Sequence, residues 1–254
     1  NTFEESIRSN TILVSVMHVN NEIGVIQPID KIGAICKSNG IIFHVDAAQS
    51  IGKIPVDMND MGIDLLSISA HKLYGPKGVG ALYIRSKNPR IQLQPIIFGG
   101  GHERGIRSGT LPVPNIVGMG KACDIAKNNM MEESQKIELL RNQLLESIMN
   151  DNPNAKLNGS MDKRIVGNLN ISFPGMNNES IIAAVPEIAI SSGAACTTST
   201  MEPSHVLLAL RLSKEEAYSS LRFGIGRFNT EDDVKTAAEV MKRCMQKLMK
   251  MSYA

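Results

Sequence analysis

A near-continuous run of apolar and β-branched residues, Thr11–Val19, is the feature that most constrains the fold. Such a run is typical of a strand buried on both faces, as in a parallel sheet covered by helices. Ile29–Ser38 follows with helical apolar spacing, and Asn39-Gly40 after it is typical of a helix C-terminal cap. A second apolar run, Ile41–Val45, ends at Asp46. Strand, helix and strand in this order predict an α/β fold with a mainly parallel sheet.

The remaining elements divide the chain into two parts. The pattern predicts further strands at Leu65–Ser69 and Val79–Ile84, and then helix-forming sequence from about Pro114 to Asn150. Beyond this helix it predicts a smaller α+β region with strands at Ile165–Phe173, Ile188–Ile190 and Leu221–Gly224 and helices at Glu179–Val185, Pro203–Leu210 and Thr230–Met251. We therefore expect residues 1–125 to belong to a large domain and residues 151–254 to form a small one, with the long helix joining them.

Composition narrows the class of protein. With 43% hydrophobic and 20% charged residues in 254, the chain is typical of a soluble globular protein. A net charge of +2 gives no reason to expect binding to nucleic acid or to a membrane surface. No apolar run approaches the roughly 20 residues of a membrane helix. The four cysteines form no CxxC pair, so the sequence indicates neither a disulfide framework nor a zinc site and favours a reducing compartment.

Polar residues follow two of the predicted strands, at the end of the sheet where ligands collect. Ser69, His71 and Lys72 combine a lysine that can form a Schiff base with two side chains that can hold a phosphate. Taken alone, this string also fits a surface lysine beside a structural histidine. Asp46 favours a site for an aldehyde cofactor with a pyridine ring, because an aspartate facing the ring nitrogen keeps that nitrogen protonated. Gln49 is close enough in sequence to reach the ring hydroxyl of such a cofactor.

A family resemblance rests on six segments that occur in order along the chain. They are NNEIGVIQPI (Asn20–Ile29), HVDAAQSIGKIPVD (His44–Asp57), SISAHKLYGPKGVGALYIR (Ser67–Arg85), GGGHERGIRSGT (Gly99–Thr110), SSGAACTT (Ser191–Thr198) and SSLRFGIGRF (Ser219–Phe228). They resemble the corresponding segments of group I cysteine desulfurases of the NifS- and IscS-like, iron–sulfur-assembly type, within the class-V aminotransferases. The resemblance runs from near residue 1 to about residue 245. It implies the aspartate-aminotransferase-like fold (fold type I) of pyridoxal 5′-phosphate (PLP) enzymes.

The resemblance also implies a role for each residue of the site. Lys72 would hold PLP as a covalent aldimine, with Asp46 at the pyridine nitrogen, Gln49 at the ring oxygen, Asn21 near that oxygen and the substrate carboxylate, Ser69 and His71 at the phosphate, and Arg222 at the substrate carboxylate. In the family, a threonine matching Thr110 reaches the phosphate of the neighbouring subunit. A homodimer with composite sites is therefore expected.

Cys196 lies in a segment of small and polar residues, Ser191–Thr200, which favours a mobile loop with an accessible thiol. Without the PLP motifs, an inert loop cysteine would be the simpler interpretation. By resemblance, the Cys196 thiolate takes sulfur from L-cysteine, giving L-alanine and a persulfide that passes to iron–sulfur scaffold and tRNA-thiolation acceptors. The family also implies Cys196 as an iron–sulfur ligand shared with a scaffold protein. The SSGxAC string resembles group I rather than group II enzymes.

Two alternatives stay open. The family's enzymes carry a further segment before the point matching Asn1, with a phosphate-binding turn and a histidine that stacks on the ring. Without such a segment, the chain would be a non-catalytic dimerising or interaction module. Another fold type I lyase or aminotransferase is the second alternative, which Cys196 disfavours. A C-terminus ending at Ala254 is shorter than the family's scaffold-docking tail. The expected compartment is a bacterial cytoplasm or, as the second choice, a mitochondrial matrix.

Overall fold

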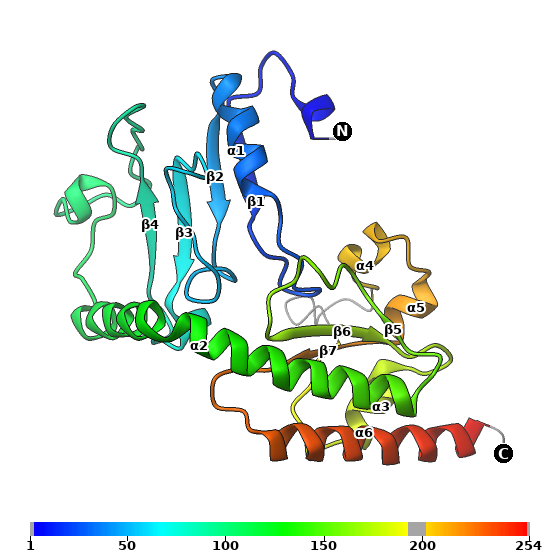
Figure 1. Cartoon of the computed structure of the whole chain (residues 1–254). Coiled ribbons are helices and arrows are strands. Elements are labelled where there is room, and N and C mark those ends of the chain that lie inside the picture. Colours follow the sequence, from blue (N-terminus) through cyan, green and yellow to red (C-terminus); the bar gives the residue numbers. More distant parts are fainter. Residues whose placement is uncertain (1–2, 193–201, 253–254) are drawn as a thin grey trace. The chain divides into compact units, whose positions relative to one another are not determined.

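A computed structural model describes residues 3–192 and 202–252. The chain divides into two compact units, one made of residues 1–19 and 27–130 and the other of residues 20–26 and 131–254 (Figure 1). The short early segment 20–26 thus belongs with the C-terminal half of the chain. The domain limits expected from the sequence, 1–125 and 151–254, stay a prediction.

The first unit contains a four-stranded sheet in the order β1-β2-β3-β4 (Figure 1). Its strands are β1 (Leu13–Met17), β2 (Ile42–Asp46), β3 (Leu65–Ser69) and β4 (Gly80–Ile84). β1, β2 and β3 are parallel, and β4 pairs antiparallel with β3. The predicted α/β class with a mainly parallel sheet is confirmed.

Helix α1 (Ile29–Ser38) packs against one face of this sheet. The buried side chains Phe43 and Val45 of β2 share its core with Cys36. The intervening residues of β2, including Asp46, point to the opposite face because side chains alternate along a strand. The predicted cap is confirmed, since Asn39 is the C-cap and Gly40 has a φ of +65°. The spacing of its apolar residues and its capping residues were enough to predict the bounds of this helix.

The prediction that the first strand is buried on both faces is wrong. Leu13 and Met17 are 50% and 40% exposed, whereas Val14 and Val16 are partly buried against the core. β1 lies at the edge of the sheet, and within residues 3–192 and 202–252 only one of its faces is covered. An apolar run shows that a strand can be buried, but burial on both faces needs a packed layer on each side.

The second unit contains a three-stranded antiparallel sheet in the order β5-β6-β7. Its strands are β5 (Lys156–Leu157), β6 (Asn168–Ser172) and β7 (Ser220–Gly224). Besides α1, the described residues form the helices η1 (Glu4–Ser6), η2 (Ala70–Leu73), η3 (Glu103–Gly105), α2 (Val113–Asp151), α3 (Asn178–Ala184), α4 (His205–Ala209), α5 (Lys214–Tyr218) and α6 (Glu231–Ser252). The long helix α2 begins in the first unit and ends in the second. Its second half shares a core with β6, β7, α3 and α6.

The second unit departs from the sequence expectations in three places. Ile188–Ile190 is not a strand, and among the described residues of that stretch only the adjacent Ser191 forms a bridge, to Arg222. β6 is shorter than the strand expected at Ile165–Phe173 and is buried at every position. Helix α5 was not predicted, although Ser213 and Glu216 form the capping box that marks its start. None of the helices within the described residues is long and apolar enough to cross a membrane.

Candidate active site

Two strand ends in the first unit carry the predicted cofactor-binding side chains. Asp46 is the last residue of β2 and pairs in register with Ser67 of β3, and Ser69 ends β3. Because β2 and β3 are parallel and adjacent, both polar ends lie at the same edge of the sheet. Asp46 is exposed and its Oδ1 accepts a hydrogen bond of 2.9 Å from Ala48 N. The carboxylate is therefore held in place by the turn that follows it.

Lys72 and His71 lie on η2, the short 3₁₀ helix directly after β3. Both are exposed, while their neighbours Ala70 and Leu73 are buried and anchor the turn. Tyr74 closes the turn in a left-handed conformation with a φ of 66°. The sequence thus places an amine and an imidazole on a rigid support at the end of the sheet.

Gln49 lies in the turn after Asp46, and its amide contacts a lysine that the sequence patterns did not single out. Lys53 Nζ donates a hydrogen bond of 3.0 Å to Gln49 Oε1. Burial and, to a lesser extent, the neighbouring charge of Lys72 lower the pKa of Lys53 to about 8. Lys53 therefore belongs to the electrostatic surroundings of Lys72.

The side chains at this edge fit the polar groups of PLP. The amine of Lys72 suits the aldehyde, the carboxylate of Asp46 suits a protonated pyridine nitrogen, and the hydroxyl of Ser69 suits the phosphate. Ser69 makes no capping hydrogen bond to η2, so its hydroxyl is not committed to the helix that follows it. His71 adds a second donor for the phosphate. Together these side chains offer a partner for the aldehyde, for the ring nitrogen and for the phosphate.

Thr110 lies at the end of the glycine-rich segment 99–110 and is exposed. Hydrogen bonds within the segment order it, from Gly101 N to Ser108 Oγ at 3.2 Å and from Gly109 N to His102 Nδ1 at 3.3 Å. These contacts order the segment that precedes Thr110 in the first unit.

Arg222 and Asn21 come together in the second unit. Arg222 Nη1 donates to the main-chain oxygen of Asn21 at 3.1 Å. The main chain of Arg222 also exchanges two hydrogen bonds with Ser191, at 2.7 and 3.3 Å. The guanidinium thus keeps further donors beside Asn21, an arrangement suited to a carboxylate.

Asn21 is positioned by the residues on both of its sides. Asn20 Oδ1 accepts hydrogen bonds from the main-chain N–H groups of Glu22 and Ile23, at 2.9 and 3.0 Å. Glu22 is 3% exposed, and its Oε2 accepts a hydrogen bond of 2.6 Å from Ser204 Oγ. The main-chain oxygen of Glu22 accepts from the side-chain amide of Asn170 at 3.3 Å. Residues 20–26 are therefore fixed to β6 and to the start of α4.

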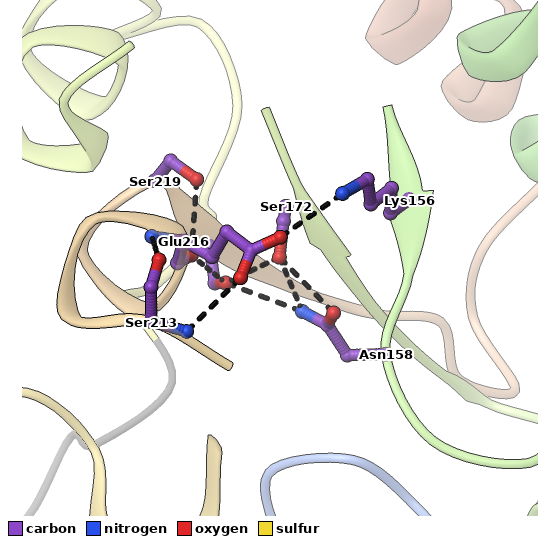
Figure 2. A network of polar contacts seen from close by, with 7 residues as sticks. Lys156, Asn158, Ser172, Ser213, Glu216 and Ser219 are labelled. Atoms are coloured by element: carbon purple, nitrogen blue, oxygen red, sulfur yellow. Dashed lines mark hydrogen bonds and ion pairs between the residues drawn. The ribbon is translucent and has the colours of Figure 1, made fainter. Parts of the chain in front are cut away.

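A polar network supports the beginning of β7, which carries Arg222 (Figure 2). The Asn158 amide donates to Ser172 Oγ at 2.8 Å, and the hydroxyls of Ser172 and Ser220 lie 2.8 Å apart. Ser220 in turn donates to the main-chain oxygen of Glu216 at 2.7 Å. These buried bonds connect β6, β7 and α5 two residues before Arg222.

Glu216 connects this network to Lys156 and to the start of α5 (Figure 2). Its carboxylate accepts a hydrogen bond of 3.0 Å from Ser213 N and forms an ion pair of 3.0 Å with Lys156. The Ser213 N–H and then Lys156 lower the pKa of Glu216. The carboxylate is thus held in its charged form, which keeps α5 capped.

Cys196, the predicted sulfur carrier, lies outside the described residues, and its iron–sulfur ligand role stays a prediction with it. The other three cysteines, Cys36, Cys123 and Cys244, are free thiols. Burial raises the pKa of both Cys36 and Cys244, which keeps them protonated. No cluster of metal-ligating side chains occurs within the part of the chain that the structure covers.

Comparison with curated proteins finds close relatives along nearly the whole chain. The chain is 53% identical over 249 residues to a probable mitochondrial cysteine desulfurase of Dictyostelium discoideum, covering 98% of this chain and 55% of that protein. It is 55% identical over 249 residues to the cysteine desulfurase IscS of Ehrlichia chaffeensis, covering 98% of this chain and 61% of that protein. The chain thus spans about 60% or less of the length of these relatives.

Solved structures agree with these matches. A NifS-like protein superposes with a TM-score of 0.87 at 33% identity, over 96% of this chain and 64% of that one. A structure described as SspA in complex with cysteine superposes with a TM-score of 0.74 at 40% identity, over 90% of this chain and 63% of that one. The family model for class-V aminotransferases matches residues 1–236, which include both groups of site residues. The chain is a member of the class-V aminotransferase family.

Proposed function

We propose that the protein is a PLP-dependent cysteine desulfurase that converts L-cysteine to L-alanine and holds the sulfur as a persulfide on Cys196. The observation that carries the proposal is the position of Asp46 at the end of β2 and of Lys72 on the helix directly after β3, the neighbouring parallel strand. The cysteine desulfurases among the relatives and the SspA structure with cysteine support this choice of substrate.

PLP, when bound, withdraws electrons from the α-carbon of an amino acid joined to it. In the proposed site, Asp46 holds the proton on the ring nitrogen and Gln49 donates to the ring oxygen. Ser69 and His71 bind the phosphate. Lys72 provides the attachment point and, once released, an amine that moves the α-proton of the substrate.

The second group of residues binds the substrate and takes its sulfur. Arg222 pairs with the α-carboxylate of L-cysteine, beside Asn21. The Cys196 thiolate attacks the substrate sulfur, so a bond forms between the two sulfurs as the bond from sulfur to Cβ breaks. Cβ then takes a proton, and alanine leaves. Because only the thiolate attacks, acid should slow persulfide formation before it prevents PLP binding.

The proposal extends to partners by family. Thr110 would reach the phosphate of a second copy, giving a homodimer with composite sites. Iron–sulfur scaffold and tRNA-thiolation proteins would receive the sulfur, with Cys196 as a shared iron–sulfur ligand on a scaffold. A bacterial cytoplasm or a mitochondrial matrix fits the relatives from Ehrlichia chaffeensis and from Dictyostelium mitochondria.

The test separates the proposal from both alternatives. The purified protein is incubated with PLP and examined for the visible band of the lysine-bound cofactor, and then L-cysteine is added and alanine and sulfide are assayed. No band would favour a non-catalytic module, and a band without sulfide would favour another PLP enzyme. Cys196→Ser should keep the band and abolish sulfide release, and persistent sulfide would remove Cys196 from its role. Lys72→Ala should abolish the band.

A further inference from the structure

Lys53 is a partly buried lysine whose position the reaction as proposed does not explain. It follows Gln49 by four residues in a series of tight turns, with Ser50 N bonded to Ala47 O at 3.1 Å and Lys53 N bonded to Ser50 O at 3.0 Å. Ala47 and Ser50 are fully buried, so these turns are firmly anchored. Burying an ammonium group opposes folding unless the group is well paired. A lysine kept in such a place calls for a specific role.

The contact between Lys53 and Gln49 fixes the orientation of an amide. Lys53 Nζ lies 3.0 Å from Gln49 Oε1, and an ammonium group can only donate hydrogen bonds. The amide oxygen must therefore be the end that faces Lys53. The Nε2 group, which has two hydrogens and no acceptor capacity, is then the end presented elsewhere.

This orientation has a chemical consequence for the ring oxygen of PLP. An anionic ring oxygen beside the amide needs a donor, which Nε2 supplies and Oε1 would not. The charge of Lys53 also polarises the amide and strengthens its N–H donors. We propose that Lys53 is a positioning residue that fixes Gln49 with its Nε2 donor toward the ring oxygen of PLP. This inference rests on the proposed PLP site.

Lys72 gives an independent reason to place Lys53 within the cofactor's surroundings. Burial is the main cause of the lowered pKa of Lys53, and the charge of Lys72 is the second. The charge of Lys72 therefore acts on the ammonium group of Lys53. Lys53 is therefore hydrogen-bonded to the residue proposed for the ring oxygen and influenced by the charge of the residue proposed for the aldehyde.

A double-mutant cycle on PLP affinity tests the proposal. The dissociation constant is measured from the visible band during titration with PLP, for the parent protein, Lys53→Met, Gln49→Leu and the double variant. Lys53→Met should weaken PLP binding by roughly three- to tenfold, the range for one oriented hydrogen bond. In the Gln49→Leu background, the same change should have no effect, because Lys53 acts through the amide. An equal effect in both backgrounds, or none in either, would overturn the proposal.

Gln49→Glu provides a second variant that keeps the Lys53 contact. A glutamate can accept from Lys53, but when ionised it has no donor for the ring oxygen. It should weaken PLP binding at least as much as Lys53→Met, and unchanged binding would overturn the proposal. Lys31→Met is the matched control, since Lys31 is an exposed lysine of α1. A loss of affinity in Lys31→Met equal to that in Lys53→Met would also overturn it, by showing a general charge effect.

These outcomes distinguish the inference from the proposed function. A parent protein without the PLP band would defeat the proposed function, and the inference with it. A parent protein that binds PLP and releases sulfide, with unchanged affinity in Lys53→Met, would defeat the inference alone. A parent protein that binds PLP without sulfide release would defeat the desulfurase proposal, while the cycle would still decide the role of Lys53.

Discussion

The Oγ of Ser204 donates a hydrogen bond of 2.6 Å to Oε2 of Glu22, although 182 residues separate them along the chain. Ser204 also caps α4, since its Oγ accepts from Leu207 N at 3.2 Å. Ile23, next to Glu22, packs with Leu207 in a small apolar cluster. One hydroxyl therefore serves both the start of α4 and a buried carboxylate.

Ser204→Ala should destabilise the protein by about 2–3 kcal/mol, because it removes a helix cap and leaves a buried carboxylate without its donor. Ser213→Ala is the matched control, since Ser213 caps α5 but its partner Glu216 lies at the surface. We expect that control to lose about 1 kcal/mol. Urea denaturation measures both, and equal losses would show that the contact with Glu22 adds nothing to the cap.

Arg222→Gln should raise the KM for L-cysteine about 10- to 100-fold with a much smaller change in kcat, because a charge-assisted pair with the substrate carboxylate is lost. Arg243→Gln is the control, since Arg243 is exposed and forms only a loose ion pair of 3.6 Å with Glu187. Steady-state kinetics of sulfide release measures both variants. An unchanged KM in Arg222→Gln would exclude Arg222 from substrate binding.

The strand ends of the site were predictable because their signals are local. Each signal is an apolar run followed by polar residues, Asp46 in one case and Ser69 and Lys72 in the other. Such a pattern can be recognised from neighbouring residues alone. The structure places these residues at one sheet edge, as parallel pairing requires. The same local logic gave α1 and its cap at Asn39.

Long-range contacts were not predictable from such patterns. Residues 20–26 belong to the second unit because Glu22 bonds to Ser204 and to the amides of β6, and no sequence pattern indicates a partner that far away. The burial of β6 on both faces has the same origin, since Asn158 satisfies the polar groups of Asn170 and Ser172. Lys53 was missed because its role depends on burial, and its residue type alone indicates a solvated surface group.

The stability contribution of Lys53 should depend on pH in a defined direction. Its pKa is about 8 in the folded protein, against 10.5 for an ordinary exposed lysine. Between these values the unfolded chain binds the proton and the folded protein does not, so the parent protein gains stability as the pH rises through this window. Below this pH window, Lys53 is charged in both the folded and the unfolded protein, so the full cost of burying its charge opposes folding.

Lys53→Met removes this effect. The variant should therefore be most favoured relative to the parent near pH 7, and its advantage should shrink toward pH 10. Chemical denaturation at several pH values measures the difference in the free energy of unfolding. Lys31→Met, with an exposed lysine, should show a difference that does not change with pH. A flat difference for Lys53→Met would mean that burial does not perturb its titration.

Two glycines within helices should respond to alanine in opposite directions. Alanine normally stabilises a helix interior relative to glycine by about 1 kcal/mol. At Gly33 in α1, however, a Cβ atom would clash with the main-chain oxygen of Met61. Gly33→Ala should therefore destabilise the protein by several kcal/mol, about the scale of overpacking a core.

At Gly120 in α2, a Cβ atom would meet nothing within 4 Å, so Gly120→Ala should stabilise the protein. Thermal denaturation of both variants measures the contrast, and a stabilised Gly33→Ala would show that α1 does not pack this closely on the turn at Met61.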